Sequence, residues 1–244
     1  MTKDEILSEL EKCNLKDCSI ENAQIIDRVT RVLRNDLFIS NVNKNRIGNL
    51  QFLAEKYITF KNMDHNPRIF KMEDGRKCIY TNHFFIVTEK YIDKEKILSG
   101  FNHSLAEGRE SSLPINRFFR YDFSVYTKKD IDRLPDLYSK IKTKLGRKQN
   151  DNLVYCIREK DYVLDLDPIV VNAKYLFDIC VALNTTSVFY MTSSRSSKEP
   201  IFISKYDIEE LHNEDFAVLM PICPSQIINH HVNEVIDYSL EMIR

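Results

Sequence analysis

A run of basic side chains in the second half of the chain could bind phosphate groups. Between residues 140 and 148 the sequence contains no acidic residue and five cations: Lys140, Lys142, Lys144, Arg147 and Lys148. Cations that contact DNA phosphates bind without reading the bases, and their contacts weaken as salt rises. A solvated, lysine-rich helix would show the same pattern, so these residues alone leave both interpretations open.

Two carboxylates could bind a divalent cation. Asp165 and Asp167 alternate, so on a strand they would share one face. A polar strand end explains the same spacing equally well. His230 and His231 are adjacent, with Cys223 nearby, but adjacent residues on a helix point about 100° apart and chelate poorly together. We therefore predict no metal site, and the two aspartates remain the sole support for a metal-dependent nucleic-acid enzyme.

The sequence offers no pattern that pairs a nucleophile with a base. It lacks the G-x-S-x-G elbow, the helical HExxH motif and the glycine-rich phosphate loops, and it contains 5 glycines. None of the 6 cysteines stands in CxxC spacing, which is typical of reduced thiols in a cytosolic protein. We expect a non-enzymatic protein with no catalytic residue and no cofactor.

Composition indicates a soluble globular protein. Hydrophobic residues make up 43% and charged residues 29%, and 35 basic against 36 acidic residues give a net charge of −1. Any attraction to nucleic acid must therefore come from a local cluster. The charged N-terminus does not read as a signal peptide, and no apolar run is long enough to span a membrane. We expect a cytoplasmic protein without membrane partners.

Hydrophobic periodicity and turn residues predict the elements of the first half. Amphipathic helices are expected first, and then strands around the hairpin turn at 73–76. A polar stretch over 106–112 is expected to be a linker. The predicted helices cover residues 3–12, 19–34 and 46–57, and the predicted strands cover 68–72, 77–80 and 84–87.

The second half is expected to alternate strands and helices. One helix begins near Pro135 and ends near Gly146, with the basic run on its outward side. A second helix is capped by Asn172 and carries an apolar stripe of Leu176, Ile179, Cys180 and Leu183. Strands are expected over 120–126, 152–157, 162–164, 188–191, 201–203 and 216–220. Two helices packed on an antiparallel sheet define an α+β fold.

We divide the chain into three parts at the predicted linker and after the last strand. Residues 1–112 form an N-terminal domain of helices and a β-hairpin, and residues 113–222 form an α+β domain. Residues 223–244 form an amphipathic tail, in which Val235, Ile236, Leu240 and Ile243 stand at helical spacing.

Three segments resemble the bacterial DNA polymerase sliding-clamp family (the β-clamp). Residues 170–183 are similar to the family's last helix, with its N-x-KYL phrase. Residues 193–203 resemble the hairpin that follows, and 216–222, the phrase FAVLMPI, resembles the closing strand with its Met-Pro pair. In the first half, residues 74–76 and 81–89 are faintly similar to another clamp hairpin. The resemblance covers less than half of the chain.

The resemblance implies a ring that encircles double-stranded DNA and holds polymerases on it. The basic helix would then line the hole through Lys140, Lys142, Lys144, Arg147 and Lys148. A groove bordered by Leu219, Met220, Pro221 and Ile222 would bind short peptides of a polymerase and a clamp loader. Family chains carry three domains, and six domains close a ring. This chain has room for two domains, so a closed ring would be a homotrimer.

This chain also departs from the family. Ile222 stands where the family has a second methionine, and the tail continues beyond it. A clamp-like domain repurposed as a protein-interaction module without DNA binding is therefore an alternative to the sliding clamp, and the metal-dependent enzyme is another.

Overall fold

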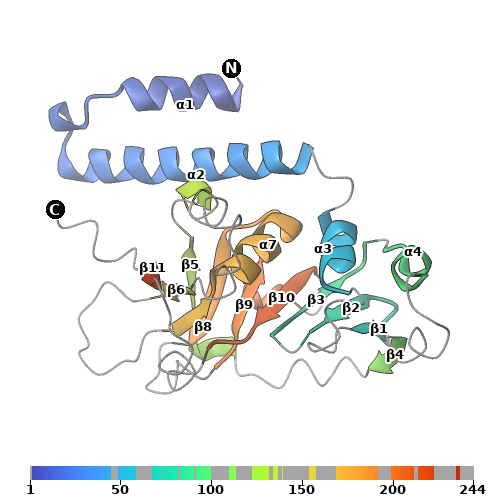
Figure 1. The fold of residues 1–244 in the computed structure, drawn as a ribbon. Coiled ribbons are helices and arrows are strands. Elements are labelled where there is room, and N and C mark those ends of the chain that lie inside the picture. The colour runs from blue at the N-terminus through green and yellow to red at the C-terminus, as the bar shows by residue number, and fades with distance from the viewer. Residues whose placement is uncertain are drawn as a thin grey trace.

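The fold is α+β, with helices gathered on one side of a large sheet (Figure 1). The computed structural model describes residues 2–44, 49–58, 68–72, 74–81, 83–90, 92–99, 110–113, 123–131, 134–136, 139, 154–157, 169–191, 199–211, 214–222 and 235–236. All structural statements below concern these residues.

Eight strands form the large sheet. Neighbouring strands are antiparallel except the first pair, β4 and β1, which are parallel. In spatial order the strands are β4 (Glu110–Leu113), β1 (Arg68–Met72), β2 (Lys77–Tyr80), β3 (Phe84–Thr88), β10 (Phe216–Leu219), β9 (Ile201–Ser204), β8 (Ser187–Met191) and β5 (Tyr126–Asp130).

Side chains alternate between two apolar layers, as the period of two in a strand requires. In β10, Ala217 and Leu219 enter the core under the helices, whereas Phe216 and Val218 enter a second cluster on the opposite face. The second cluster is closed by short 3₁₀ segments, η4 (Phe123–Val125) and η7 (Ile208–Glu210). The sheet is therefore buried on both faces at its centre.

The predicted hairpin is confirmed. Strands β1 and β2 match the expected ranges, and Gly75 at the turn has φ 90°, a left-handed conformation that glycine adopts without strain. The third strand, β3, follows after Thr81, whose hydroxyl accepts from the Phe84 amide at 3.0 Å.

Helices α3 (Asn49–Tyr57) and α7 (Ala173–Leu183) cover the sheet side by side. α7 begins where predicted, because the Asn172 side chain accepts from the amides of Lys174 and Tyr175. It ends at Asn184, which has φ 56° in the left-handed cap position. A short helix, α4 (Lys94–Leu98), was not predicted.

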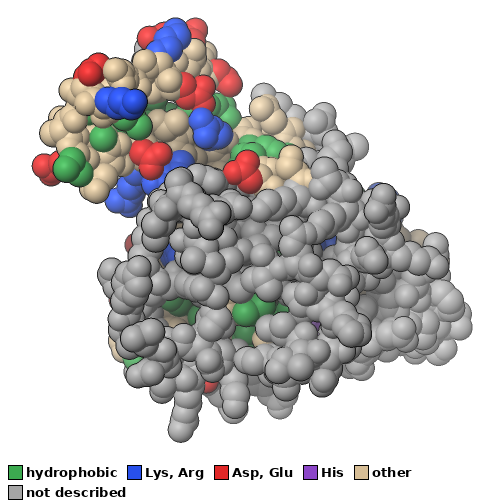
Figure 2. Space-filling view, turned by 60° about the vertical axis from the view of Figure 1, so that its left-hand side comes forward, with side chains coloured by type: hydrophobic (Ala, Val, Ile, Leu, Met, Phe, Trp, Pro, Cys, Tyr) green, Lys and Arg blue, Asp and Glu red, His purple; other side chains and the backbone are tan. Residues whose placement is uncertain are grey.

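Two N-terminal helices form a hairpin above this layer (Figures 1 and 2). α1 (Lys3–Lys12) has the predicted bounds, and α2 (Ile20–Lys44) extends well past the predicted end at residue 34. A 3₁₀ turn, η1 (Leu15–Asp17), joins them. α2 continues because its later residues pack on the body: Ile39 is buried and the Phe38 ring meets Phe177 edge-on at 6.3 Å.

A second, three-stranded sheet has the order β11 (Val235–Ile236), β6 (Val154–Ile157) and β7 (Ile169–Asn172). β6 lies within a predicted strand, whereas β7 was not predicted. β11 corrects the expectation of helical spacing in the tail, because Val235 and Ile236 are extended and pair in parallel with β6. Their β-branched side chains suit a strand.

Two expectations near the middle of the chain are wrong. The strand expected over 120–126 is displaced: Phe123–Val125 form η4, and β5 occupies 126–130. The Phe123 ring instead packs edge-on against Phe202 at 5.3 Å, which anchors the turn to the second cluster. The linker expected over 106–112 overlaps β4, which pairs with β1.

The predicted division at residue 112 does not separate two cores. β3 from the first part pairs with β10 from the second over four residue positions, and one apolar core contains side chains from both. Of the helix expected from Pro135, residues 134–136 and 139 are helical. The remainder of that helix and the strand expected over 162–164 lie outside the described residues.

Candidate protein-docking surface

The chain segment after β10 connects the two sheets. The Met220 amide donates to the His83 carbonyl at 2.8 Å, and the Ile222 amide donates to the Val170 carbonyl at 2.7 Å. Met220 is 43% exposed, whereas Pro221 and Ile222 are half-buried. Two backbone hydrogen bonds therefore hold the Met-Pro pair at the surface, between the turn before β3 and the start of α7.

Leu219 does not border this surface. It is fully buried on the helix side of the sheet. Of the four residues predicted to line a peptide groove, Met220, Pro221 and Ile222 are accessible in part, and Leu219 belongs to the core because the strand alternation turns it inward.

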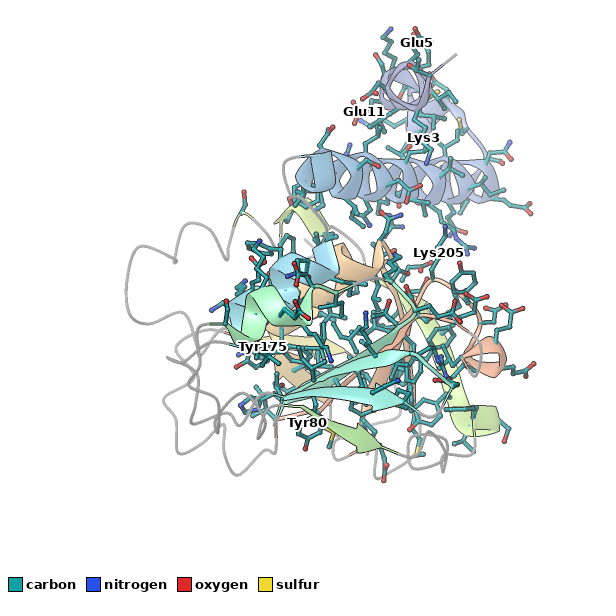
Figure 3. The ribbon with its side chains drawn as sticks, turned by 90° about the vertical axis from the view of Figure 1, so that its right-hand side faces the viewer. Lys3, Glu5, Glu11, Tyr80, Tyr175 and Lys205 are labelled. Carbon is teal, nitrogen blue, oxygen red and sulfur yellow. The ribbon has the colours of Figure 1, made fainter. Side chains whose placement is uncertain are left out.

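Aromatic rings adjoin the segment. The His83 ring stacks on Tyr175 at 5.3 Å, and Tyr175 also contacts Phe84 at 5.5 Å and Tyr57 at 5.5 Å. His83 and Tyr175 are half-exposed, and Figure 3 shows Tyr175 on the helix side of the sheet, opposite Tyr80. We call His83, Tyr175 and Met220 the aromatic surface.

A buried carboxylate anchors the aromatic surface from below. Asp178 on α7 is 5% exposed, and its Oδ2 accepts from the Tyr57 hydroxyl at 2.6 Å and from Lys56 Nζ. Because burial of an unpaired carboxylate is costly, these two donors from α3 tie α3 to α7. The pair thereby fixes the place of Tyr57, whose ring supports Tyr175.

The edge of α3 extends this region with an exposed ring. Phe52 is 37% exposed, and Lys56 Nζ lies 5.9 Å from the centre of its ring and 5.4 Å from that of Tyr57. Half-exposed rings beside a thioether form a surface on which apolar peptide side chains can dock, since these groups offer large contact area at low entropic cost.

Two of the described cysteines are buried and unreactive. Burial raises the pKa of the Cys78 and Cys180 thiols, so both stay protonated and are poor nucleophiles. Among the residues that the structure describes, no cluster of three or more histidine, cysteine, aspartate or glutamate side chains could bind a metal ion. Within the same residues, no helix is both long and apolar enough to cross a bilayer.

Several predicted site residues lie outside the described part of the chain: Lys140, Lys142, Lys144, Arg147, Lys148, Asp165, Asp167, Cys223, His230 and His231. Their proposed roles stay predictions.

The sequence patterns did not predict the position of His83 beside Tyr175, or the contacts of Asp178 with Tyr57 and Lys56. One signal was present: Asp178 stands between the apolar residues Phe177 and Ile179 of a mostly hydrophobic helix, and such a carboxylate needs a partner. Which residue supplies that partner depends on α3, more than a hundred positions earlier, and no local pattern reveals it.

Comparisons with known proteins returned no match: neither a family model, nor a curated protein, nor a solved structure is similar to this chain. The functional argument therefore depends on the residues and their geometry.

Proposed function

We propose that the protein is a sliding clamp or clamp-like processivity factor of DNA replication. It would encircle double-stranded DNA without catalysing a reaction and would dock short peptides of a polymerase and a clamp loader. The observation that carries the proposal is the order of α7, the β8–β9 hairpin and β10, which ends in the surface-held Met220 and Pro221. The resemblance in the sequence rests on that same order of helix, hairpin and closing strand.

The first half supports the proposal through its placement. α3 precedes the antiparallel strands β1, β2 and β3, and it lies on the same side of the sheet as α7. The β3–β10 pairing extends the sheet from one group of strands to the next. The resemblance to the clamp family implies this kind of edge-to-edge joining, with helices toward the inside of the ring and sheet toward the outside.

The contact with DNA would come from residues other than those of α7. Nine of its eleven residues are buried, and α2 crosses above it. We assign the phosphate contacts to Lys140, Lys142, Lys144, Arg147 and Lys148. These contacts would be weak and sensitive to salt, so the ring could slide.

Two measurements test the clamp. Light scattering should give an oligomer whose mass is a multiple of three chains. Association with nicked circular DNA should weaken at least tenfold when Lys140, Lys144 and Arg147 are all changed to glutamate. A matched control changes Lys16, Lys90 and Lys205, three exposed lysines elsewhere, to glutamate. Equal loss in both triple variants, or a mass that is no multiple of three, would contradict the proposal.

Peptide docking is tested at Met220. Met220→Glu should abolish binding of fluorescent short peptides that carry two apolar anchors, and His83→Ala should weaken it, because both residues form the aromatic surface. Val125, also 43% exposed, ends η4 just before β5, an edge strand four places from β3 in the sheet, and gives the control Val125→Glu. If Met220→Glu and Val125→Glu bind peptide equally well, the docking site is elsewhere.

A second candidate is a clamp-like interaction module that does not bind DNA. The position of α2 favours it, because Phe38 and Phe177 join α2 to α7 across the helix side, where a clamp would face DNA. This candidate predicts peptide docking without measurable affinity for circular DNA at low salt. The metal-dependent enzyme predicts DNA cleavage that Asp165→Asn removes, and absence of cleavage with magnesium or manganese would dismiss it.

A further inference from the structure

The hairpin of α1 and α2 buries very little of its own surface. No side chain of α1 is buried, and on α2 the first buried residue is Asn35. From Asn35 onward α2 is held by the body: the Asn35 side chain donates to the Ile131 carbonyl at 3.0 Å and accepts from the Leu134 amide at 3.1 Å. The hairpin is therefore anchored at one end and exposed along the rest.

An apolar stripe lies open on this exposed part. Ile25, Val29 and Val32 are 55%, 42% and 45% exposed, and their spacing of four and three residues places them on one face of α2. Leu15 and Ile20, in the same hairpin, are exposed as well. Exposed apolar side chains that gather in this way mark an interaction surface.

One edge of the stripe is acidic. Glu11 on α1 pairs with Arg34 on α2 at 2.6 Å, and residues two positions apart on a helix point about 200° apart. Glu11 and Arg34 lie on one flank of the hairpin. Glu9, two positions from Glu11, and Val32, two positions from Arg34, therefore lie on the other flank. Glu9 and the stripe share a flank, and the Glu9 side chain is 64% exposed. In Figure 3, Lys3 lies between α1 and α2, Glu11 lies at one side of α1, and Glu5 points away from α2.

The other edge of the stripe carries an exposed arginine. Arg28 is exposed and stands one turn before Val32. It lies about 120° around α2 from Arg34, which pairs with Glu11 of α1, so Arg28 occupies the edge away from α1. Along the antiparallel helices, the Lys3–Asp36 pair at 2.9 Å places Glu9 near the level of Thr30 and the Glu11–Arg34 pair places it nearer Asp36, so Glu9 lies within about two turns of the level of Arg28.

We propose that a second copy of this chain covers the stripe and that the two hairpins form a four-helix bundle. A twofold axis parallel to α2 would bring the two stripes together and place the Arg28 edge of each copy against the Glu9 edge of the other. Arg28 would then pair with Glu9 of the second copy, twice by symmetry. The complementary edges and the isologous geometry of a twofold favour a second copy over an unrelated partner.

Such an association would stabilise a hairpin that is weakly supported alone. Two helices with one shared apolar seam leave their remaining apolar side chains in water, and four helices enclose them. The existing Glu9–Lys12 pair at 2.7 Å is exposed on both sides and contributes little, so Glu9 can exchange Lys12 for Arg28 of the second copy.

Light scattering of the full chain at several concentrations tests the proposal. Val29→Glu should halve the mass, whereas Val125→Glu, a substitution at an equally exposed residue outside the hairpin, should leave it unchanged. Circular dichroism of both variants should retain the helical signal. A mass that Val29→Glu leaves unchanged while the helices remain folded would overturn the proposal.

A charge exchange tests the assigned pair. Arg28→Glu and Glu9→Arg should each halve the mass, because each places like charges opposite one another, and the double variant should restore it. Failure of the double variant to restore the mass would overturn the pairing of Arg28 with Glu9 of a second copy. If another protein covers the stripe instead, the isolated chain shows no mass change in any variant, which also overturns the proposal.

These results are separable from those for the clamp. A ring of three chains that also pairs through its hairpins falls from six chains to three when the stripe is charged. A chain that forms no ring falls from two to one. The stripe variants should leave peptide binding at Met220 intact in either case.

Discussion

Helices α2 and α7 cross in the molecule and use their side chains in opposite ways. α7 is an 11-residue helix with nine buried residues. α2 is a 25-residue helix, and most side chains in its first half are exposed. α7 therefore holds the sheet and the aromatic surface together, whereas the exposed part of α2 is free to meet another molecule. A substitution on α7 should therefore change mainly the free energy of unfolding. A substitution on the exposed part of α2 should change mainly the association of the chain with another molecule.

The sharpest test of this contrast is Phe177→Ala. Phe177 is 2% exposed and its ring contacts Phe38 of α2, so truncation leaves a cavity at the crossing. We expect a loss of about 3–5 kcal/mol in the free energy of unfolding, measured by urea denaturation.

The matched change on α2 is Val29→Ala. Val29 is 42% exposed, and its removal should change the unfolding free energy of the unassociated chain by about 0.5 kcal/mol or less. A similar loss for both variants would show that the two helices do not differ in the way described.

Asp178→Ala should have the next largest effect. It leaves the Tyr57 hydroxyl and Lys56 without their shared acceptor, and we expect a loss of about 2 kcal/mol in stability. Lys56 is 28% exposed, and water will replace part of its interaction.

A double-mutant cycle with Tyr57→Phe separates the hydrogen bond from the loss of packing. The cost of Asp178→Ala should be smaller in the Tyr57→Phe background, since one of its donors is already absent. Strict additivity of the two substitutions would mean that the bond does not connect α3 with α7.

The end of α7 gives a smaller effect. Asn184 has φ 56°, a conformation that alanine adopts with strain and glycine adopts freely. Asn184→Ala should cost about 1 kcal/mol, and Asn184→Gly should be close to neutral. Thermal unfolding of the two variants measures the difference, and equal midpoints would show that the cap conformation carries no cost.

Local patterns predicted the parts of the fold that local physics determines. The Asn172 cap and the apolar stripe gave α7, and the turn at Gly75 gave the β1–β2 hairpin. The extension of α2 beyond residue 34 was missed, because polar residues there alternate with side chains that find their partner on α7. β4 was read as a linker since a polar sequence hides a strand that pairs through its backbone.

The candidate site was predictable to a lesser extent. The Met-Pro pair drew attention to the segment after β10, and the structure places that segment against His83 through a backbone hydrogen bond. Burial of Leu219 follows from the place of β10 at the centre of a sheet with both faces covered, which strand alternation alone does not reveal. The partnership of Asp178 with Lys56 and Tyr57 joins residues far apart in the chain, and no spacing rule connects them.

The smallest expected effect concerns the outward ion pair of α3. Lys56 turns inward to Asp178, whereas Glu55 turns outward to Lys96 of α4 at 2.8 Å. The hydrogen bond from Lys96, followed by that from Gln51, lowers the pKa of Glu55 below its ordinary value. Its contribution to stability is therefore complete above that value and is lost as the pH falls through the lower pKa of the folded state.

Glu55→Gln should remove this acid sensitivity with little change at neutral pH, because Glu55 is more than one-third exposed and water screens its pair with Lys96. Urea midpoints measured between about pH 3 and 7 for the wild type and Glu55→Gln should diverge slightly as the pH rises through the acid range. A divergence as large as the effect of Asp178→Ala would show that the outward ion pair stabilises the fold as much as the buried one. That result would contradict the expectation that buried contacts contribute more than exposed ones, on which the contrast between α7 and α2 depends.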